Sequence, residues 1–149
     1  KEAEVGHLTS QFHKLVEGAR ISVTAVTYNF SHKSWMWQGL KEASERPGVR
    51  VAVYVDRDRA NPGSVKAQMP KATVYRSGVL PNGKKIVSHA KFVIIDHSIM
   101  LLTSANFSYS AENQNVEFGI LVRDSRLAES VEEVMAEKRG TLYEEVMRA

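Results

Sequence analysis

Apolar residues switch between helical and strand spacing along the first third of the chain, and this alternation most limits the possible folds. A helical repeat runs from Leu8 to Ala19, and the mostly apolar, β-branched run from Ile21 to Tyr28 predicts a strand covered on both faces. Ser34 is placed to cap a helix from about Trp35 to Glu45, and Val49 to Asp56 predicts a second strand. This order predicts an α/β fold, with a mixed, largely parallel β-sheet sandwiched between helices.

The middle of the chain combines turn residues with a shorter strand. The stretch from Arg57 to Pro70 contains two prolines, a glycine and few apolar residues, which predicts mainly loop. A strand follows near Ala72 to Arg76, and Pro81-Asn82-Gly83 predicts a turn because Asn-Gly adopts positive φ at low cost. No internal repeat is present, so we predict a single domain over residues 1–149.

Two short apolar runs, Phe92 to Ile95 and Ile99 to Thr103, lie close enough in the sequence to form a hairpin. Val116 to Val122 predicts another strand. The apolar face of a terminal helix is marked by Leu127, Val131, Val134 and Met135.

Composition fits one globular domain. Of the 149 residues, 43% are apolar and 25% are charged, and a chain of this length buries about 70% of the surface that it exposes when unfolded. The absence of cysteine excludes disulfides, thiolate metal sites and thiol nucleophiles. No apolar run is long enough to span a bilayer, so we expect a cytoplasmic protein without stable membrane association. Because the chain starts at Lys1, we expect that a preceding segment has been removed.

Charge is unevenly distributed, although the formal net charge is only +3. Between Arg57 and Lys85 there are seven basic residues and the single acid Asp58, whereas seven acids and four bases follow from Asp124 onwards. A basic middle predicts one positive face that binds a polyanion, although an ordinary solvated loop region would show the same charges. The candidate substrate-binding residues are Arg57, Arg59, Lys84 and Lys85.

Four polar residues are evenly spaced around the predicted hairpin. His89 and Lys91 are two apart, so in a strand they project from the same face, and Ser104 and Asn106 repeat that spacing after the second run. Taken singly, each has an ordinary structural explanation, such as an edge lysine or a helix-capping asparagine. An imidazole and an ammonium do not satisfy each other, however, and the four groups together indicate a site for an anion.

These residues resemble a known signature. The HxK(x)4D(x)6GSxN motif of the phospholipase D superfamily is matched by His89, Lys91, Asp96, Ser104 and Asn106. Thr103 stands where the motif has glycine, which leaves the two functional side chains in place. Glu117 matches the position of an acid in small nucleases of the superfamily, and VTAVTYNF, residues 23–30, resembles their first core strand. The chain is most similar to the compact bacterial branch with one motif per chain, which includes the phospholipase-D-like component of the DISARM phage-defence system.

The resemblance implies a phosphodiesterase that uses neither a metal nor another cofactor. In such an enzyme His89 attacks phosphorus and forms a phosphohistidine, while Lys91, Ser104 and Asn106 hold the non-bridging oxygens. Glu117 orients the histidine by accepting a hydrogen bond from the N–H of the other ring nitrogen. The leaving oxygen takes a proton from a second histidine, which the family supplies from a second motif. A chain with one motif therefore implies a homodimer that pairs two His89 residues across a two-fold axis.

Asp96 is interpreted differently from the other motif residues. It falls on the opposite strand parity from Lys91, at the end of the apolar run, so we assign it a supporting role in fixing the turn before His97. The histidines without a lysine partner at the motif spacing, which we expect on the surface or in turns, are His7, His13, His32 and His97.

Three classes of function remain open. The leading one is a nuclease acting on DNA more than on RNA, because the basic stretch would follow a nucleic-acid backbone. The second is a phospholipase or small-molecule phosphodiesterase, for which an acyl groove or membrane-facing helix is expected and neither is evident in the sequence. The third is a non-catalytic nucleic-acid-binding subunit. The presence of all three motif residues His89, Lys91 and Asn106 argues against this class.

Overall fold

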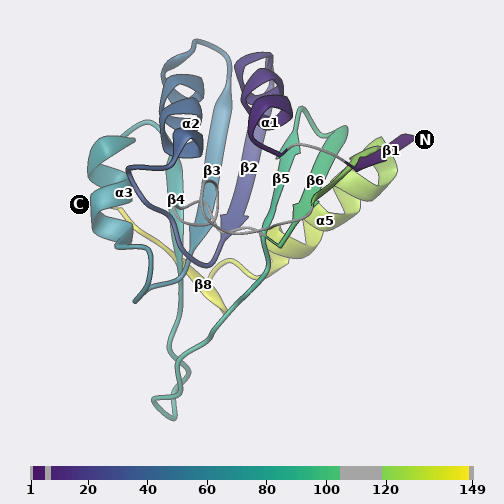
Figure 1. Cartoon of the computed structure of the whole chain (residues 1–149). Helices are drawn as coiled ribbons and strands as arrows, with labels where there is room; N and C mark the ends of the chain where they lie inside the picture. The colour runs from purple at the N-terminus through teal and green to yellow at the C-terminus, as the bar shows by residue number, and fades with distance from the viewer. Residues whose placement is uncertain (1, 6–7, 105–118, 148–149) are drawn as a thin grey trace.

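The computed structural model describes residues 2–5, 8–104 and 119–147, which form the helices and strands shown in Figure 1. The strands are β1 (Glu2–Val5), β2 (Ser22–Thr27), β3 (Arg50–Val55), β4 (Thr73–Ser77), β5 (Phe92–Ile95), β6 (Ile99–Thr103), β7 (Gly119–Arg123) and β8 (Tyr143–Glu145). The helices are α1 (Leu8–Glu17), α2 (Trp35–Glu45), α3 (Pro62–Gln68) and α5 (Ser125–Glu137).

Within the described residues, the strands form one sheet in the order β1-β7-β6-β5-β2-β3-β4-β8. β2 pairs in parallel with β3, and β3 with β4, because α2 and α3 carry the chain back between these strands. The remaining pairings are antiparallel. The predicted mixed α/β fold is confirmed, but a largely parallel arrangement holds only at β2-β3-β4. The difference arises because β5 and β6 form a hairpin, and because β1 and β8, the two outermost strands, pair antiparallel with their neighbours.

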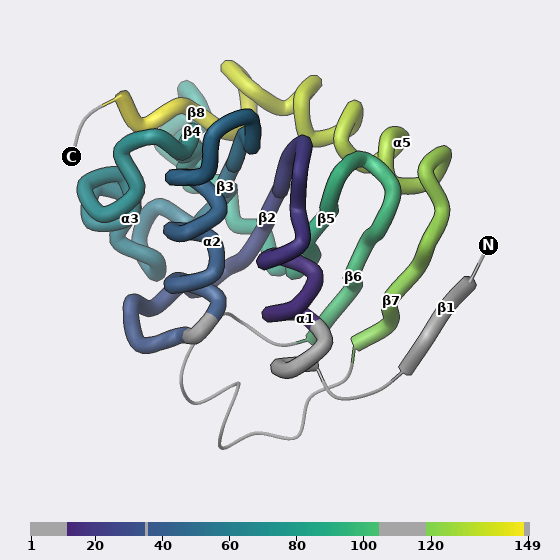
Figure 2. The backbone as a smooth tube through the Cα atoms, turned by 90° about the horizontal axis from the view of Figure 1, so that it is seen from above, coloured from purple at the N-terminus to yellow at the C-terminus, as the bar shows by residue number. Residues whose placement is uncertain are grey.

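Helices cover both faces of this sheet, as Figure 2 shows from above. On one face, α1, α2 and α3 bury side chains such as Met36 and Val65 against the strands. On the other face, Ala128 and Met135 of α5 pack with Tyr54 of β3. Strands covered on both faces need apolar residues at successive positions, which explains the continuous apolar run that predicted β2.

α2 and the β5-β6 hairpin agree closely with their predictions. The Oγ of Ser34 accepts a hydrogen bond from the N–H of Met36 at 3.1 Å, which caps α2 at its first turn. The helix ends at Glu45, just before Arg46-Pro47, because the residue before proline avoids helical backbone angles. In the hairpin, Phe92 lies opposite Leu102.

α3 lies in the stretch that was predicted to be mainly loop. Proline fits the first turn of a helix, where its missing N–H would have no helical partner, and Pro62 occupies that position here. The Oδ1 of Asn61 accepts a hydrogen bond from the N–H of Ser64 at 3.3 Å and caps the helix. The proline therefore marks a helix start, not a loop.

The buried face of α5 is narrower than predicted. Ala128 and Met135, seven positions apart, are buried, whereas Leu127 and Val134 are 39% and 49% exposed. Consecutive residues on a helix point about 100° away from each other. A narrow contact between α5 and the sheet therefore buries Ala128 and Met135 and leaves Leu127 and Val134 in solvent.

Candidate active site

Several strand ends meet at one edge of the sheet, called the site edge below, which is the lower edge in Figure 1. It contains the C-terminal ends of β2, β3, β4 and β6 and the N-terminal end of β5. The register fixes this, because Val26 of β2 lies opposite Phe92 of β5, which lies opposite Leu102 of β6. In α/β sheets, ligands bind beyond the carboxyl ends of parallel strands, so the site edge is the expected place for a functional site.

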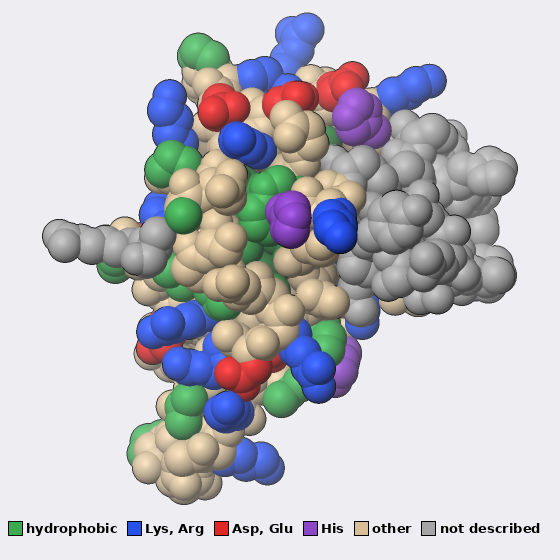
Figure 3. All heavy atoms as spheres, turned by 60° about the vertical axis from the view of Figure 1, so that its left-hand side comes forward, with side chains coloured by type: hydrophobic (Ala, Val, Ile, Leu, Met, Phe, Trp, Pro, Cys, Tyr) green, Lys and Arg blue, Asp and Glu red, His purple; other side chains and the backbone are tan. Residues whose placement is uncertain are grey.

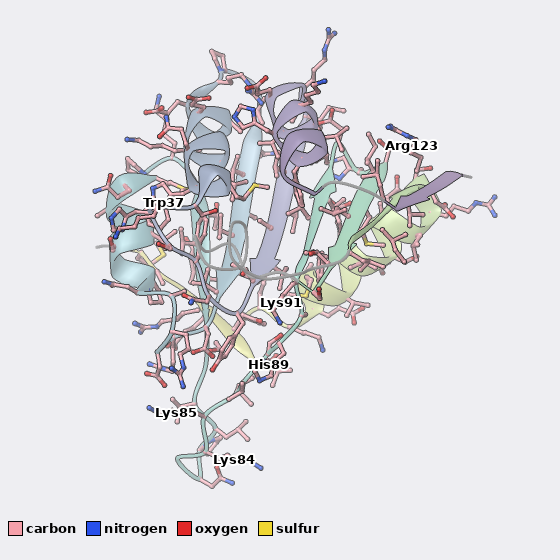
Figure 4. All side chains as sticks on the ribbon, in the orientation of Figure 1. Trp37, Lys84, Lys85, His89, Lys91 and Arg123 are labelled. Atoms are coloured by element: carbon pink, nitrogen blue, oxygen red, sulfur yellow. The ribbon has the colours of Figure 1, made fainter. Side chains whose placement is uncertain are left out.

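His89 and Lys91 lie at the site edge, in an irregular segment just before β5 (Figure 4). The expectation that they project from one face of a strand is therefore wrong, because regular pairing starts only at Phe92. The exposed imidazole of His89 packs on the ring of Tyr28, with centroids 4.4 Å apart and planes inclined by 36°. The Nζ of Lys91 donates to the backbone carbonyl of His89 at 2.8 Å, so the lysine is brought to the histidine by a local contact.

Contacts with neighbouring elements hold this irregular segment in place. The hydroxyls of Ser88 and Tyr143 of β8 form a hydrogen bond. The N–H of Thr103, at the end of β6, donates to the carbonyl of Lys91 at 3.1 Å. His89 therefore sits on a segment tied to strands on both sides, which limits the positions that its imidazole can take.

Only one of the other three predicted catalytic residues falls among the described residues. Ser104 is exposed and directly follows β6, so it lies at the site edge close to Lys91. Asn106 and Glu117 lie outside the described residues. Ser104 and Gly119, the described residues that flank residues 105–118, are both at the site edge, since Gly119 lies opposite Thr103.

Asp96 is at the other edge of the sheet, about 17 Å from Lys91 at the rise per residue of a strand. Its carboxylate accepts hydrogen bonds from the backbone N–H groups of Arg20, Ile21 and Ser22 at 2.7–3.1 Å. Asp96 has a positive φ of 53°, which places it in the turn between β5 and β6. Its contacts join that turn to the start of β2 and do not reach the site edge.

Acidic β8 neutralises part of the basic stretch. The Nη1 of Arg57 donates to the carbonyl of Ser77 at 3.3 Å and lies 3.5 Å from Glu144, which also binds the Nε of Arg76 at 2.7 Å. Arg57, a predicted substrate-binding residue, is thus engaged with β4 and β8. On the face shown in Figure 3, basic and acidic side chains are interspersed.

A buried carboxylate organises the turn that follows β3. The Oδ2 of Asp56 accepts hydrogen bonds from the N–H groups of Asp58 and Arg59 at 3.0 and 3.1 Å, and its Oδ1 accepts one from the hydroxyl of Ser77 at 3.3 Å. The turn presents Arg59, whose Nε donates to the hydroxyl of Tyr28 at 3.1 Å. A continuous set of contacts therefore links the core of β3 and β4 to the ring beneath His89.

Lys84 and Lys85 lie on a projecting hairpin, residues 78–87, called the arm below (Figure 4). The arm is held by a bridge between Val79 and Lys85 and by the N–H of Leu80 donating to Lys84 at 2.8 Å. Gly83 has a φ of 85°, which confirms the predicted turn at its tip. Lys84 is exposed near the tip, whereas Lys85 forms an ion pair with Asp58 at 2.9 Å.

The arm and the turn after β3 line a cavity of about 320 Å³ that is open to solvent and reaches Tyr28, the ring that contacts His89. Its lining residues are Tyr28, Asp56, Asp58, Arg59, Lys85, Ile86 and Val87. Tyr28 therefore connects the histidine to the cavity, since its ring contacts His89 and also lines this cavity. Neither Tyr28 nor Asp56 was predicted to have a role; the only signal in the sequence was the position of Tyr28 at the end of a predicted strand.

This geometry can be set against known proteins. A family model described as "Cardiolipin synthase, PLD-like domain" matches residues 13–139. The chain belongs to this phospholipase D-like family. The predicted superfamily membership is confirmed, and the match spans both His89 and Lys91.

The curated relatives share this family. "Phospholipase D" of Rickettsia prowazekii is 31% identical over 118 residues, and "Phospholipase D" of Rickettsia typhi is 30% identical over 118 residues. Each alignment covers 77% of this chain and 54% of the relative, so the chain spans about half the length of these proteins.

Solved structures show the same fold. Nuc from Salmonella typhimurium, a phospholipase D family member, superposes with a TM-score of 0.77 at 23% identity, covering 99% of both chains. NucT from Helicobacter pylori gives 0.72 at 21% identity, covering 91% of this chain and 94% of that protein. The archaeal chromatin protein TrmBL2 gives 0.59 at 14% identity, covering 92% of this chain and 52% of that protein. The chain thus has the fold of phospholipase D-family enzymes, while the narrower resemblance to the DISARM component stays a prediction.

Two absences within the described residues relate to the predictions on metals and on membranes. Across residues 2–5, 8–104 and 119–147, no group of three or more metal-ligating side chains is placed to hold a metal ion. In the same ranges, no helix is long and apolar enough to cross a membrane. That the reaction needs no metal ion, and that the protein is cytoplasmic, both remain predictions.

Proposed function

We propose that this chain is the catalytic domain of a metal-independent nuclease that cleaves phosphodiesters through a phosphohistidine on His89. The observation that carries the proposal is the exposed imidazole of His89, set beside Lys91 at the carboxyl ends of β2-β3-β4 in a phospholipase D-like domain. An exposed histidine that is held by a ring contact is accessible to a polymeric diester and still has a restricted orientation.

The reaction has two displacement steps. First, an unprotonated ring nitrogen of His89 attacks phosphorus, and the bond from phosphorus to the leaving oxygen breaks. Lys91, Ser104 and Asn106 offset charge on the non-bridging oxygens, and Glu117 accepts a hydrogen bond from the N–H of the other ring nitrogen. Water then attacks phosphorus, the P–N bond breaks, and His89 is regenerated.

The proton balance calls for a second histidine. The leaving oxygen needs a proton in the first step, and the attacking water must lose one in the second, so a single acid–base group can serve both steps. We assign that group to His89 of a second copy, related by a two-fold axis that brings the two site edges together.

Nucleic acid is the preferred substrate class, with DNA ahead of RNA. Lys84 lies near the tip of the arm, which projects beyond the site edge, where it would meet a phosphate backbone that leads away from His89. The neighbours Nuc and NucT share the whole fold, and TrmBL2 is described as showing a novel mode of DNA binding. A role in antiviral defence rests on the resemblance to the DISARM component alone.

A phospholipid diester is the second candidate, because the curated relatives are named phospholipase D. Two exposed valines on the arm, Val79 and Val87, would contact lipid, although two small side chains bury little apolar area.

One assay separates these candidates. Labelled single-stranded DNA, duplex DNA, RNA and phosphatidylcholine vesicles are incubated with the protein in excess EDTA, with His89→Ala as control. We expect cleavage of nucleic acid that His89→Ala abolishes, with a phosphoenzyme trapped when the wild-type reaction is quenched with SDS at alkaline pH, where a P–N bond survives. Release of choline without nucleic-acid cleavage would establish the second candidate instead, and cleavage that depends on added Mg²⁺ would contradict the proposed chemistry.

A further inference from the structure

We propose that the cavity between Tyr28 and the arm binds one nucleobase of the strand being cut, next to the phosphate that His89 attacks. The substrate is then single-stranded nucleic acid, or a strand end whose bases are unpaired. This inference rests on the proposed function, and it adds the substrate class and the residues that recognise it.

The cavity adjoins the ring that contacts the nucleophile. Tyr28 contacts the imidazole of His89 and also forms one wall of the cavity. A phosphate held against His89 therefore has one of its two attached nucleosides within reach of the cavity, since a base lies only a sugar away from its phosphate.

The charge of the cavity excludes a second phosphate as its occupant. Two cations, Arg59 and Lys85, line the cavity with two carboxylates, Asp56 and Asp58. Lys85 is already paired with Asp58 at 2.9 Å, and Arg59 uses its Nε on Tyr28. Four charges that cancel give no net attraction for an anion, but they offer donors and acceptors to a neutral polar group.

The walls and the volume fit a nucleobase. Tyr28 offers an aromatic ring, and Ile86 and Val87 offer aliphatic side chains, of which Val87 is 57% exposed. Aromatic side chains stack on bases of any sequence, because every base has a π-face. The cavity volume of about 320 Å³ lies at the lower end of the range for small-ligand sites. The charged lining makes it unsuitable for an acyl chain.

A base in this cavity cannot also be paired in a duplex. An intact duplex would have to extrude the nucleotide at a cost of a few kcal/mol, whereas a single strand presents unstacked bases. The Asp58–Lys85 ion pair is about half exposed, so its groups can exchange this contact for contacts with the base edge at little cost.

The test compares oligonucleotides with and without the base. Single-stranded DNA with one abasic residue on either side of a fixed cleavage position is compared with the intact strand. Stacking on an aromatic side chain is worth about 1–3 kcal/mol per base, so we expect kcat/KM to fall about tenfold when the abasic residue lies on the recognised side. Val87→Trp fills the cavity and should remove this preference.

Val79→Trp is the matched control, because Val79 is also exposed on the arm but does not line the cavity. It should keep the wild-type preference for the base. The base site would be overturned if the wild type cleaved intact and abasic strands equally, or if both tryptophan variants lost the preference for the intact strand to the same extent. Either result would leave the nuclease proposal intact.

A binding measurement keeps the two proposals separate. In the inactive His89→Ala variant, 2-aminopurine at the recognised position should lose fluorescence on binding, because it stacks on Tyr28. Val87→Trp in the same background should abolish this change. If the wild type cleaves no diester, the proposed function fails, and the fluorescence still tests the base site.

Discussion

His89 and Tyr28 form a tilted ring contact, with centroids 4.4 Å apart and planes inclined by 36°. The contact joins the segment before β5 to the end of β2, two strands that pair in antiparallel register. It gives a histidine outside regular structure a fixed neighbour. Because the terminal torsion of histidine is broad, such a neighbour determines where the ring nitrogens point.

The first prediction concerns this contact. Tyr28→Leu should lower kcat by about ten- to a hundredfold, because a small displacement of the nucleophile costs about that much. Tyr28→Phe keeps the ring and should stay within about tenfold of wild type. NMR provides the second measurement, since the ring current of Tyr28 should shift the His89 ring protons in wild type and Tyr28→Phe but not in Tyr28→Leu.

Arg59 and Arg57 supply a matched pair for the same prediction. Both are arginines of one turn, but only Arg59 donates to the Tyr28 hydroxyl, while Arg57 contacts Ser77 and Glu144. Arg59→Ala should broaden the His89 ring resonances and lower kcat, and Arg57→Ala should leave both unchanged. The positioning role is refuted if the two variants behave alike.

The second prediction concerns assembly. If each site uses a histidine from both copies, mixing wild type with His89→Ala should lower the activity per wild-type chain in proportion to the fraction of wild-type chains that enter heterodimers. After re-equilibration of an equal mixture, random pairing leaves about a quarter of the dimers fully wild type. Activity should fall to about half per wild-type chain, measured together with the dimer fraction by sedimentation. Undiminished activity in a verified heterodimer would show that one copy suffices.

The sequence predicted those parts of the fold that depend on local signals. Ser34 and Pro47 mark the ends of α2 through effects within a few residues, and the short separation of the runs Phe92 to Ile95 and Ile99 to Thr103 predicted the hairpin. β8 was missed because its few residues pair with β4 across almost half the chain, which no local pattern records. α3 was missed because proline and glycine were interpreted as loop residues, although proline also starts helices.

In the candidate site, too, features set by local sequence were predicted and contacts between distant parts of the chain were not. The motif spacing identified His89 and Lys91 as neighbours, and the structure places them together. The partners of Arg57 could not be predicted, because Glu144 approaches it from the other end of the chain. The contact between Tyr28 and His89 could not be predicted from the sequence either, because it depends on the register of β2 against β5.

The third prediction concerns the arm. Lys84→Glu with Lys85→Glu should weaken nucleic-acid binding and reduce the slope of log K against log salt by about one for each lost phosphate contact. The reaction on bis(p-nitrophenyl) phosphate should keep its kcat. Lys14→Glu with Arg126→Glu makes the same change in charge on exposed residues of α1 and α5, and should leave the slope unaltered. Equal slopes in the two double variants would remove the arm from the binding surface.

The fourth prediction separates Asp96 from catalysis. Asp96→Gly removes the acceptor for three backbone N–H groups but allows the positive φ of 53°. It should lower the free energy of unfolding by about 1–3 kcal/mol, measured by urea denaturation. Asp96→Asn keeps an acceptor oxygen and should cost less. Both variants should retain kcat within about twofold when folded, and a large loss of kcat in folded Asp96→Asn would return this residue to the catalytic set.

The last prediction concerns stability at alkaline pH. Burial raises the pKa values of Tyr54, Tyr75 and Tyr143, because the phenolate is poorly solvated inside the protein. The hydrogen bond from Arg139 to Tyr54 and the one between Ser88 and Tyr143 oppose this effect without reversing it.

The direction of the pH dependence follows from these shifts. A tyrosine whose pKa is higher in the folded state than in the unfolded state contributes stability below the unfolded pKa of about 10, and this contribution is lost as pH rises through the folded pKa. The urea midpoint should therefore stay nearly constant from about pH 7 to 9, as far as tyrosines are concerned, and decrease above about pH 10. Tyr143→Phe removes one of the titrating groups, so its midpoint should decrease less steeply above pH 10 than that of the wild type. An equally steep decrease in both proteins would assign the alkaline loss of stability to other groups.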